Sequence, residues 1–174
     1  MKALRRMLLL AAVLLTAASN ATAQKFALVD MEYILKNIPA YERANEQLNQ
    51  ISRQWQAEVE ALNNEAQTLY KNYQNELVFL SDAQKKQREE AIVNKEKSAA
   101  ELKRKYFAPQ GELFKKRESL IRPIQDEIYN AVKDISQAKG LSLVIDRSSD
   151  NGIIFASPAA DISNEVLSKL GYSN

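Results

Sequence analysis

Apolar residues recur every three or four positions through most of the chain, in two long stretches. The first covers residues 40–80 and contains no Gly or Pro. Its apolar and small positions are Leu48, Ile51, Trp55, Val59, Leu62, Ala66, Leu69, Tyr73, Leu77 and Leu80. Their mean spacing of about 3.6 residues is close to that of a straight helix and slightly above the coiled-coil repeat. The pattern predicts one long helix with a narrow apolar seam, which needs a partner helix beside it.

The second stretch, residues 82–140, provides that partner. Ser81 and Gln84 have the spacing of a capping box, and Gly140 is a typical helix stop. The residues Pro109-Gln110-Gly111 predict an irregularity, and Pro123 predicts a kink. The seam positions are Ile92, Ala99, Leu102, Tyr106, Leu113, Leu120, Ile124, Ile128 and Ile135. Because the connection between the two helices is very short, we expect an antiparallel helical hairpin.

The two ends of the chain have the pattern of strands. Short apolar runs at about 25–30, 141–147 and 152–157 predict strands, with a turn at Asn151-Gly152. Short helices are expected at about 31–37 and 162–170. The predicted class is α+β, mostly α by residue count. Residues 24–45 and 121–174 form a small β body, into which the antiparallel coiled-coil hairpin arm 46–120 is inserted, with its tip near 78–84.

The predicted strands are apolar on both faces, so both faces must be covered. Three short strands cannot close a sheet within one chain. An uncovered edge invites aggregation, so we expect the strands to pair with copies from other subunits in a closed, symmetric oligomer.

Residues 1–23 predict a cleavable secretory signal. Lys2, Arg5 and Arg6 precede an apolar stretch that is short for a membrane span, and Ala21-Thr22-Ala23 is an A-x-A cleavage pattern. The mature protein would begin at Gln24. The chain contains no cysteine, so neither disulfides nor lipid attachment at a cysteine is expected, and we predict a soluble exported protein.

Removal of the signal changes the charge balance. Three of the 24 Lys and Arg residues lie in the signal, which leaves 21 basic and 22 acidic residues and a net charge of −1. This balance argues against nucleic acid as a partner. Residues 40–80 have a net charge of −3 and residues 81–122 a net charge of +5. The difference in charge favours weak ion pairs between two solvated helices. The alternative interpretation is a basic surface that binds an anionic ligand.

The composition disfavours an enzyme. The chain has no His and no Cys, which removes the commonest general base, metal ligand and thiol nucleophile. No Gly-rich phosphate loop or nucleophile elbow occurs. Asp30, Asp146, Asp150 and Asp161 could gather as ligands of a hard cation, but helix capping and turn formation explain these residues more simply. No catalytic residue, metal or cofactor is expected.

Aromatic residues along the arm are the remaining candidates for binding. Tyr73 and Tyr106 fall on the seams and are predicted to be core residues. Off the seam lie Tyr70, Phe79, Phe107 and Phe114, and Leu80 lies beside Phe79 in the tip sequence NELVFLSD. Apolar side chains on a polar arm favour loose contact with apolar segments of other proteins. Packing between the helices near the hairpin end is the alternative.

Three segments carry a family resemblance: KFALVDMEYIL, LIRPIQDEIYNAVKDI and GLSLVIDRSSDNGIIFASPAADISNEVLSKL. They closely resemble the Skp/OmpH family of periplasmic chaperones. This resemblance implies a homotrimer in which a shared β body carries three coiled-coil arms around a cavity. Members of the family hold unfolded outer-membrane proteins without ATP. The resemblance brings no catalytic residue.

The resemblance also assigns residues. The trimer core would contain Phe26, Leu28, Leu143, Ile145, Ile153 and Phe155. Independently of the resemblance, the off-seam and tip positions described above give the client-binding candidates on the arm: Tyr70, Phe79, Leu80, Phe107 and Phe114. Familiar members are strongly basic, so the near-neutral charge here argues against binding to membrane or lipopolysaccharide. The break at Pro109–Gly111 also suggests a jointed arm. The alternative function is an envelope scaffold or tether without general chaperone activity.

Overall fold

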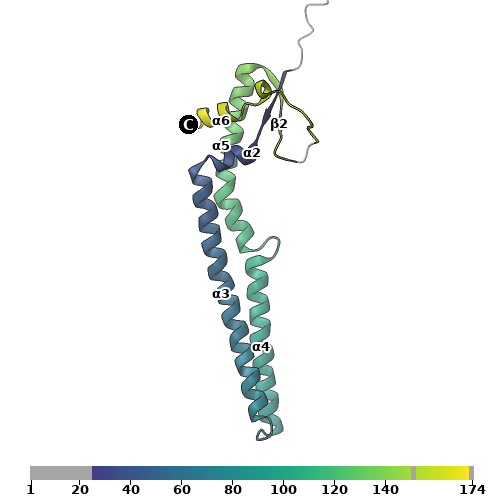
Figure 1. Ribbon diagram of the computed structural model, residues 1–174. Helices are drawn as coiled ribbons and strands as arrows, with labels where there is room; N and C mark the ends of the chain where they lie inside the picture. The colour runs from purple at the N-terminus through teal and green to yellow at the C-terminus, as the bar shows by residue number, and fades with distance from the viewer. Residues whose placement is uncertain (1–24, 150–151, 173–174) are drawn as a thin grey trace, which may run out of the picture.

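The computed structural model describes residues 25–149 and 152–172. The elements, in chain order, are β1 Lys25–Val29, α2 Met31–Lys36, α3 Pro39–Glu76, α4 Asp82–Phe107, α5 Glu112–Lys139, β2 Leu141–Asp146, the short 3-10 helix η2 Pro158–Ala160 and α6 Ser163–Lys169. The predicted α+β class, dominated by long helices, is confirmed (Figure 1). The predicted signal, the mature start at Gln24 and Asn151 of the predicted turn lie outside the described residues.

The strands β1 and β2 pair in parallel and bring the two ends of the chain together. Phe26 lies opposite Leu143, and Leu28 lies opposite Ile145. Parallel pairing requires a long crossover, and here the whole arm is that crossover. On the other edge of β1, the backbone N–H of Ile162 donates to the Leu28 carbonyl at 2.9 Å. The predicted meeting of the two ends is therefore confirmed.

One face of this sheet covers the core of the body. The core contains Ala27, Val29, Ile34, Ile38, Ile124, Ile128, Ala131, Ile135, Ile162, Val166 and Leu167. These residues come from β1, from α2 and the residue before α3, from α5, and from α6 and the residue before it. Asp30 caps α2 by accepting from the Tyr33 N–H at 2.8 Å, which turns the chain from the strand into the helix. A single chain thus builds a complete small core on one side of its sheet.

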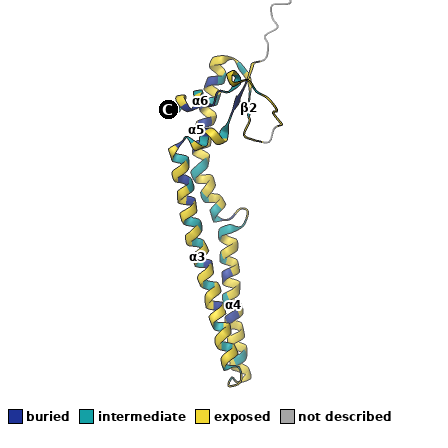
Figure 2. Cartoon of the chain, viewed as in Figure 1, coloured by how far each residue is buried: buried dark blue, intermediate teal, exposed yellow. Residues whose placement is uncertain are grey.

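The arm is a long helical hairpin in which α3 packs beside α4 and the first part of α5 (Figure 1). Its seam is narrow: most arm residues are exposed, and a thin line of buried and half-buried positions runs along it (Figure 2). All ten seam positions predicted in residues 48–80 are buried or half-buried. The capping box of Ser81 and Gln84 is present at the start of α4. The helix α3 ends at Glu76 rather than near residue 80, because Phe79 N–H donates to the Glu76 carbonyl in the turn at the tip.

The predicted irregularity in the returning limb is a full break. The helix α4 ends at Phe107, α5 begins at Glu112, and Ala108–Gly111 form a loop between them. By contrast, α5 continues through Pro123 to Lys139 and ends at Gly140, whose φ of 65° is left-handed and suits glycine. Pro123 therefore does not end the helix.

The region 152–157 differs from the prediction. No strand forms there, and the residues run as an irregular segment between β2 and η2. Among the described residues, β2 pairs only with β1, so its other edge offers no neighbouring strand within the chain. A strand needs a partner for its backbone groups, which explains why the apolar pattern alone does not produce one here.

Candidate interaction surfaces

The outer face of the two-stranded sheet, turned away from α5, is partly open. Alternation along the strands places Phe26, Leu28, Leu143 and Ile145 on this face. Phe26 is 61% exposed and Leu143 is 55% exposed, and they are neighbours in the strand register. Leu28 is only 3% exposed and Ile145 is half-buried. Two of the four residues therefore present apolar surface to solvent, whereas Leu28 is already buried within its own chain.

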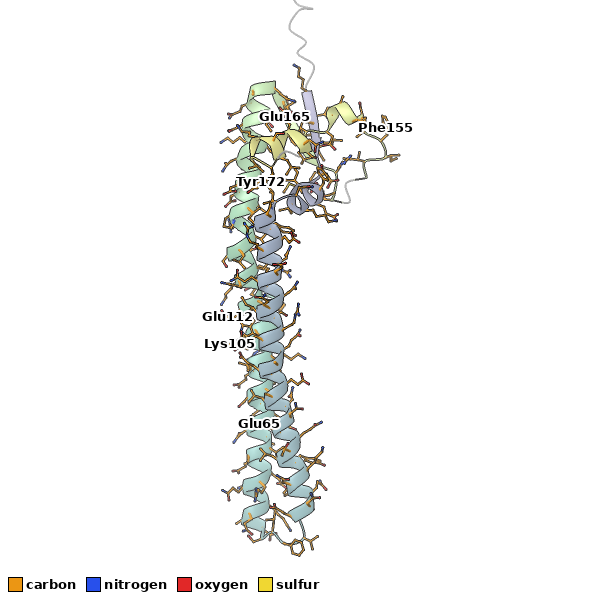
Figure 3. The ribbon with its side chains drawn as sticks, turned by 60° about the vertical axis from the view of Figure 1, so that its left-hand side comes forward. Glu65, Lys105, Glu112, Phe155, Glu165 and Tyr172 are labelled. Carbon is orange, nitrogen blue, oxygen red and sulfur yellow. The ribbon has the colours of Figure 1, made fainter. Side chains whose placement is uncertain are left out.

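The segment after β2 carries a second group of exposed apolar residues. Ile153, Ile154 and Phe155 are consecutive, and Ile154 and Phe155 are almost fully exposed. Figure 3 shows Phe155 at the outer end of this segment, away from the arm. Ile153 and Phe155 were predicted for an oligomer core. Ile154 was not, because strict strand alternation would turn it to the opposite side.

A groove of about 530 Å³ lies between α5 and the unpaired edge of β2. Its lining includes Val29, Ile128, Tyr129, Val132, Leu141 and Leu143. Tyr129 is 67% exposed and was not predicted, since it falls off the helical seam. The groove, the β2 edge and the exposed outer face form one continuous region of the body that we call the open side.

The aspartates at the strand ends form a network of hydrogen bonds and ion pairs. The Arg147 guanidinium lies 3.3 Å from Asp30 Oδ2 and 3.2 Å from Asp161 Oδ2, so it bridges two of the four candidate carboxylates. The buried Ser163 hydroxyl accepts from the Asp30 N–H and donates to Asp161 Oδ1. This network links α6 to β1 and to the end of β2. Asp150 lies outside the described residues.

Asp146, which ends β2, is held by donors from two segments. Its Oδ1 accepts from the Met31 N–H at 3.1 Å, from the Ser148 N–H at 2.9 Å and from the Ser148 hydroxyl at 2.7 Å. Partial burial acts to raise the pKa of this carboxyl, but the hydrogen bonds outweigh burial and hold the pKa below its ordinary value. Among the described residues, no group of three or more acidic side chains is arranged to hold a metal ion. Asp146 anchors the start of α2.

Two tyrosine–glutamate pairs tie the helices of the arm together. The Tyr73 hydroxyl donates to Glu89 at 2.5 Å, and the Tyr106 hydroxyl donates to Glu58 at 2.7 Å. These hydrogen bonds to a carboxylate raise the pKa of both phenols above the ordinary value, with smaller contributions from burial and from the glutamate charge. Both tyrosines are half-buried on the seam, as predicted.

Ion pairs also cross between α3 and α4. Arg88 contacts Glu76 at 3.0 Å, and Lys95 contacts Glu65 at 2.6 Å. They join the acidic first helix to the basic returning helix, as the charge pattern predicts.

The client-binding candidates are distributed along the arm and do not converge on one pocket. Phe79 is 86% exposed at the tip and Leu80 is half-buried beside it. Tyr70 is exposed on α3, where its hydroxyl accepts from the Gln74 side chain. Phe107 and Phe114 flank the break, the first half-buried and the second exposed. Val78, 87% exposed at the tip, was missed as a candidate, although it belongs to the apolar tip sequence.

Comparison with known proteins gives a family and a fold. A family described as "Outer membrane protein (OmpH-like)" matches residues 25–170. A crystal structure of an OmpH-like outer membrane chaperone from Caulobacter crescentus CB15 is similar, with a TM-score of 0.68 and 15% sequence identity. The alignment covers 87% of this chain and 86% of that chain. A comparison with curated proteins found no match. Among the described residues, no helix is long and apolar enough to cross a membrane.

Proposed function

Since the chain belongs to the OmpH-like family of outer membrane proteins, we propose that it is an ATP-independent holdase chaperone. It binds unfolded outer-membrane β-barrel precursors between its arms and prevents their aggregation. It acts in the periplasm after its signal, residues 1–23, is removed. It is a binding protein and not an enzyme.

The observation that carries this proposal is the display of apolar side chains on a polar arm. Val78 and Phe79 are almost fully exposed at the tip, and Phe114 is 47% exposed beside the break. The tip pair Val78–Phe79 and Phe114 lie on separate parts of the arm, so a client makes several weak contacts instead of one tight one. Each contact contributes roughly 0.5 to 1 kcal/mol, and together they give useful affinity for many sequences.

We further propose that the open side of the body assembles three copies around one axis. Phe26, Leu143 and Phe155 would be covered in this assembly, and the segment 152–157 of one copy would pair with the unpaired β2 edge of its neighbour. Exposed apolar surface next to an unpaired strand edge is a hazard for a soluble protein, and closed assembly removes it. Three arms carried by such a body enclose a cavity.

The proposal is tested with several unrelated β-barrel precursors unfolded in urea. Each precursor is diluted into buffer with and without the purified protein, in the absence of nucleotide, and aggregation is followed by light scattering. Suppression of aggregation for all precursors supports the holdase. Aggregation unchanged for every precursor would overturn it and would favour an envelope scaffold that sets a distance between partners.

A further inference from the structure

The break at Ala108–Gly111 interrupts only one of the two helices of the arm. The returning limb loses its helical hydrogen bonding between Phe107 and Glu112, whereas α3 runs without interruption from Pro39 to Glu76. The stiffness of a helix depends on its ladder of backbone hydrogen bonds. Beside the break, only the continuous helix α3 resists bending of the arm. Elsewhere in the arm, two helices resist it together. Figure 1 shows the loop of the break projecting sideways from the arm, nearer to the body than to the tip.

The break is closely packed and is not a loose loop. The N–H of Gly111 donates to the Ala108 carbonyl at 2.8 Å, and the Ala108 N–H donates to the Arg104 carbonyl at 3.1 Å. A Cβ atom at Gly111 would lie 2.8 Å from the carbonyl oxygens of Lys105 and Tyr106. The end of α4 thus rests directly on the start of α5, and only glycine leaves room for this contact.

The continuous helix holds the end of α4 through one aromatic pair. The rings of Trp55 and Tyr106 are stacked, with centroids 4.4 Å apart and planes 5° from parallel. One turn further along α3, Glu58 accepts the Tyr106 hydroxyl at 2.7 Å. Phe107 meets the edge of the Tyr106 ring, with the two planes at 83°. Stacked aromatic pairs add about 0.5 to 1.5 kcal/mol beyond their buried area.

The surface of the arm is hollowed on either side of this pair. A hollow of about 430 Å³ lies toward the body, lined by residues that include Ile51, Trp55 and Lys116. Another of about 310 Å³ lies toward the tip, lined by residues that include Val59, Lys103 and Phe107. The stacked pair therefore stands between two open surface hollows of the arm.

We propose that the break is a bending point of the arm and that the Trp55–Tyr106 stack is the brace that keeps its two halves in line. Hinges of this kind lie at element ends that absorb a change in backbone angles, while the packed elements on both sides stay rigid. Bending would fit the distal hairpin to clients of different size, and this use of the bend rests on the proposed function. The presence of the brace does not depend on the proposed function.

The brace is tested by distance measurement within one subunit. The chain has no cysteine, so the exposed positions Asn75 on α3 and Asn130 on α5 can be changed to cysteine and spin-labelled. Labelled chains are mixed with an excess of unlabelled chains, and the distance distribution is measured by pulsed electron spin resonance without client. We expect Tyr106→Ala to broaden the distribution about twofold, because the two halves lose their brace.

Two matched variants separate bracing from general loosening. Tyr73→Ala removes the other tyrosine–glutamate pair, which lies where both helices are continuous, and should leave the distribution narrow. Trp55→Phe keeps an aromatic ring against Tyr106 and should also leave it narrow. An unchanged width in Tyr106→Ala, or equal broadening in Tyr73→Ala, would overturn the brace. Because no client is present, this result is independent of the aggregation assay.

Discussion

The body and the arm are stabilised in different ways. The body buries apolar side chains from β1 and three of its helices in one cluster, with Ile34, Ile128 and Val166 almost completely inaccessible to solvent. The arm has only a thin seam. In α4, Ile92 and Ala99 are the only buried residues, and polar ties such as Tyr73–Glu89 and Arg88–Glu76 supplement them.

This difference shows how one chain can be firmly folded and still adaptable. Apolar burial contributes much more to stability than exposed ion pairs do. A helix pair held by a thin seam keeps most of its surface in contact with solvent. The arm is therefore available to touch other molecules, whereas the body fixes the arm in place.

The difference in stability between the body and the arm is tested most strongly by a substitution in the core of the body. Ile128→Ala should lower the free energy of unfolding by about 2 to 5 kcal/mol, because it opens a cavity in a fully enclosed site. In the arm, Ile92→Ala should cost clearly less, since Ile92 is buried in a thin seam whose helices can relax around the smaller side chain. The exposed Val93→Ala serves as a control and should stay within about 0.5 kcal/mol. Urea unfolding followed by circular dichroism gives all three values, and equal losses at positions 128 and 92 would contradict the contrast.

The open side of the body should control assembly. The double substitution Phe26→Ser with Leu143→Ser is expected to dissociate the proposed trimer, because each burial of such a side chain contributes about 1.5 to 3 kcal/mol in every subunit. Analytical ultracentrifugation should show monomers with unchanged helical content. Phe79→Ser, at a still more exposed phenylalanine on the arm, should leave the mass unchanged. An oligomer that survives the double substitution would remove these residues from the interface.

The arm should control client binding. Phe79→Ser, Phe107→Ser and Phe114→Ser are each expected to weaken the affinity for an unfolded precursor about two- to fivefold, which corresponds to ~0.5 to 1 kcal/mol. Assembly should be unaffected. Asn72→Ser, an exposed polar position on the same arm, is the matched control and should bind normally. Fluorescence titration with a labelled precursor measures the effect, and full affinity in the triple variant would exclude these residues.

Acid should weaken the body through Asp146. The pKa of Asp146 is held below the ordinary value of 3.8. Its contribution to the free energy of unfolding is therefore fully present above pH 3.8 and is lost as the pH falls through the lower, folded pKa. The variant Asp146→Asn should lose part of its stability at neutral pH and show a shallower decline in acid. Unfolding measured between pH 5 and about pH 2 tests this, and identical slopes in both proteins would contradict it.

Alkali should weaken the arm through Tyr73 and Tyr106. Their pKa values are raised above 10.0, so the hydrogen bonds to Glu89 and Glu58 are present below pH 10 and are lost as the pH rises through the higher, folded pKa. The double variant Tyr73→Phe with Tyr106→Phe should lack this alkaline decline. Thermal unfolding followed at the helical signal, with ultraviolet titration of the phenols, measures the small effect. A decline that persists in the double variant would assign it to other groups.

Much of the arm could be predicted from sequence because its structure is local. The spacing of apolar residues determined the seam, and the Ser81–Gln84 pair determined the start of α4 through contacts three residues apart. The break near Pro109 was equally visible. The stack of Trp55 on Tyr106 was not, since it depends on how two helices are aligned across the arm.

The body was less predictable because its contacts are distant in sequence. Parallel pairing placed Phe26 beside Leu143, which the apolar pattern alone did not specify. Leu28 matched the pattern of an interface residue but is buried within one chain. The run 152–157 has the composition of a strand, yet a strand also requires a partner that a single chain does not supply. The aspartates had the positions of a possible cation site, but Arg147 lies between two of them.

The parallel pairing of β1 with β2 has a consequence for the order of folding. Asp30 and Ser163, which hydrogen-bond in the body, are 133 positions apart in sequence, whereas contacts across the arm span less, such as 16 positions for Tyr73–Glu89 and 48 for Tyr106–Glu58. Contacts close in sequence form in microseconds, and distant ones wait for slow loop closure. In the proposed export, the chain emerges from a membrane pore N-terminus first, so the hairpin can form while β1 still has no partner. The apolar first strand stays uncovered until almost the last residues arrive, so during its own export a protein proposed to guard others passes through a stage in which it needs the same protection.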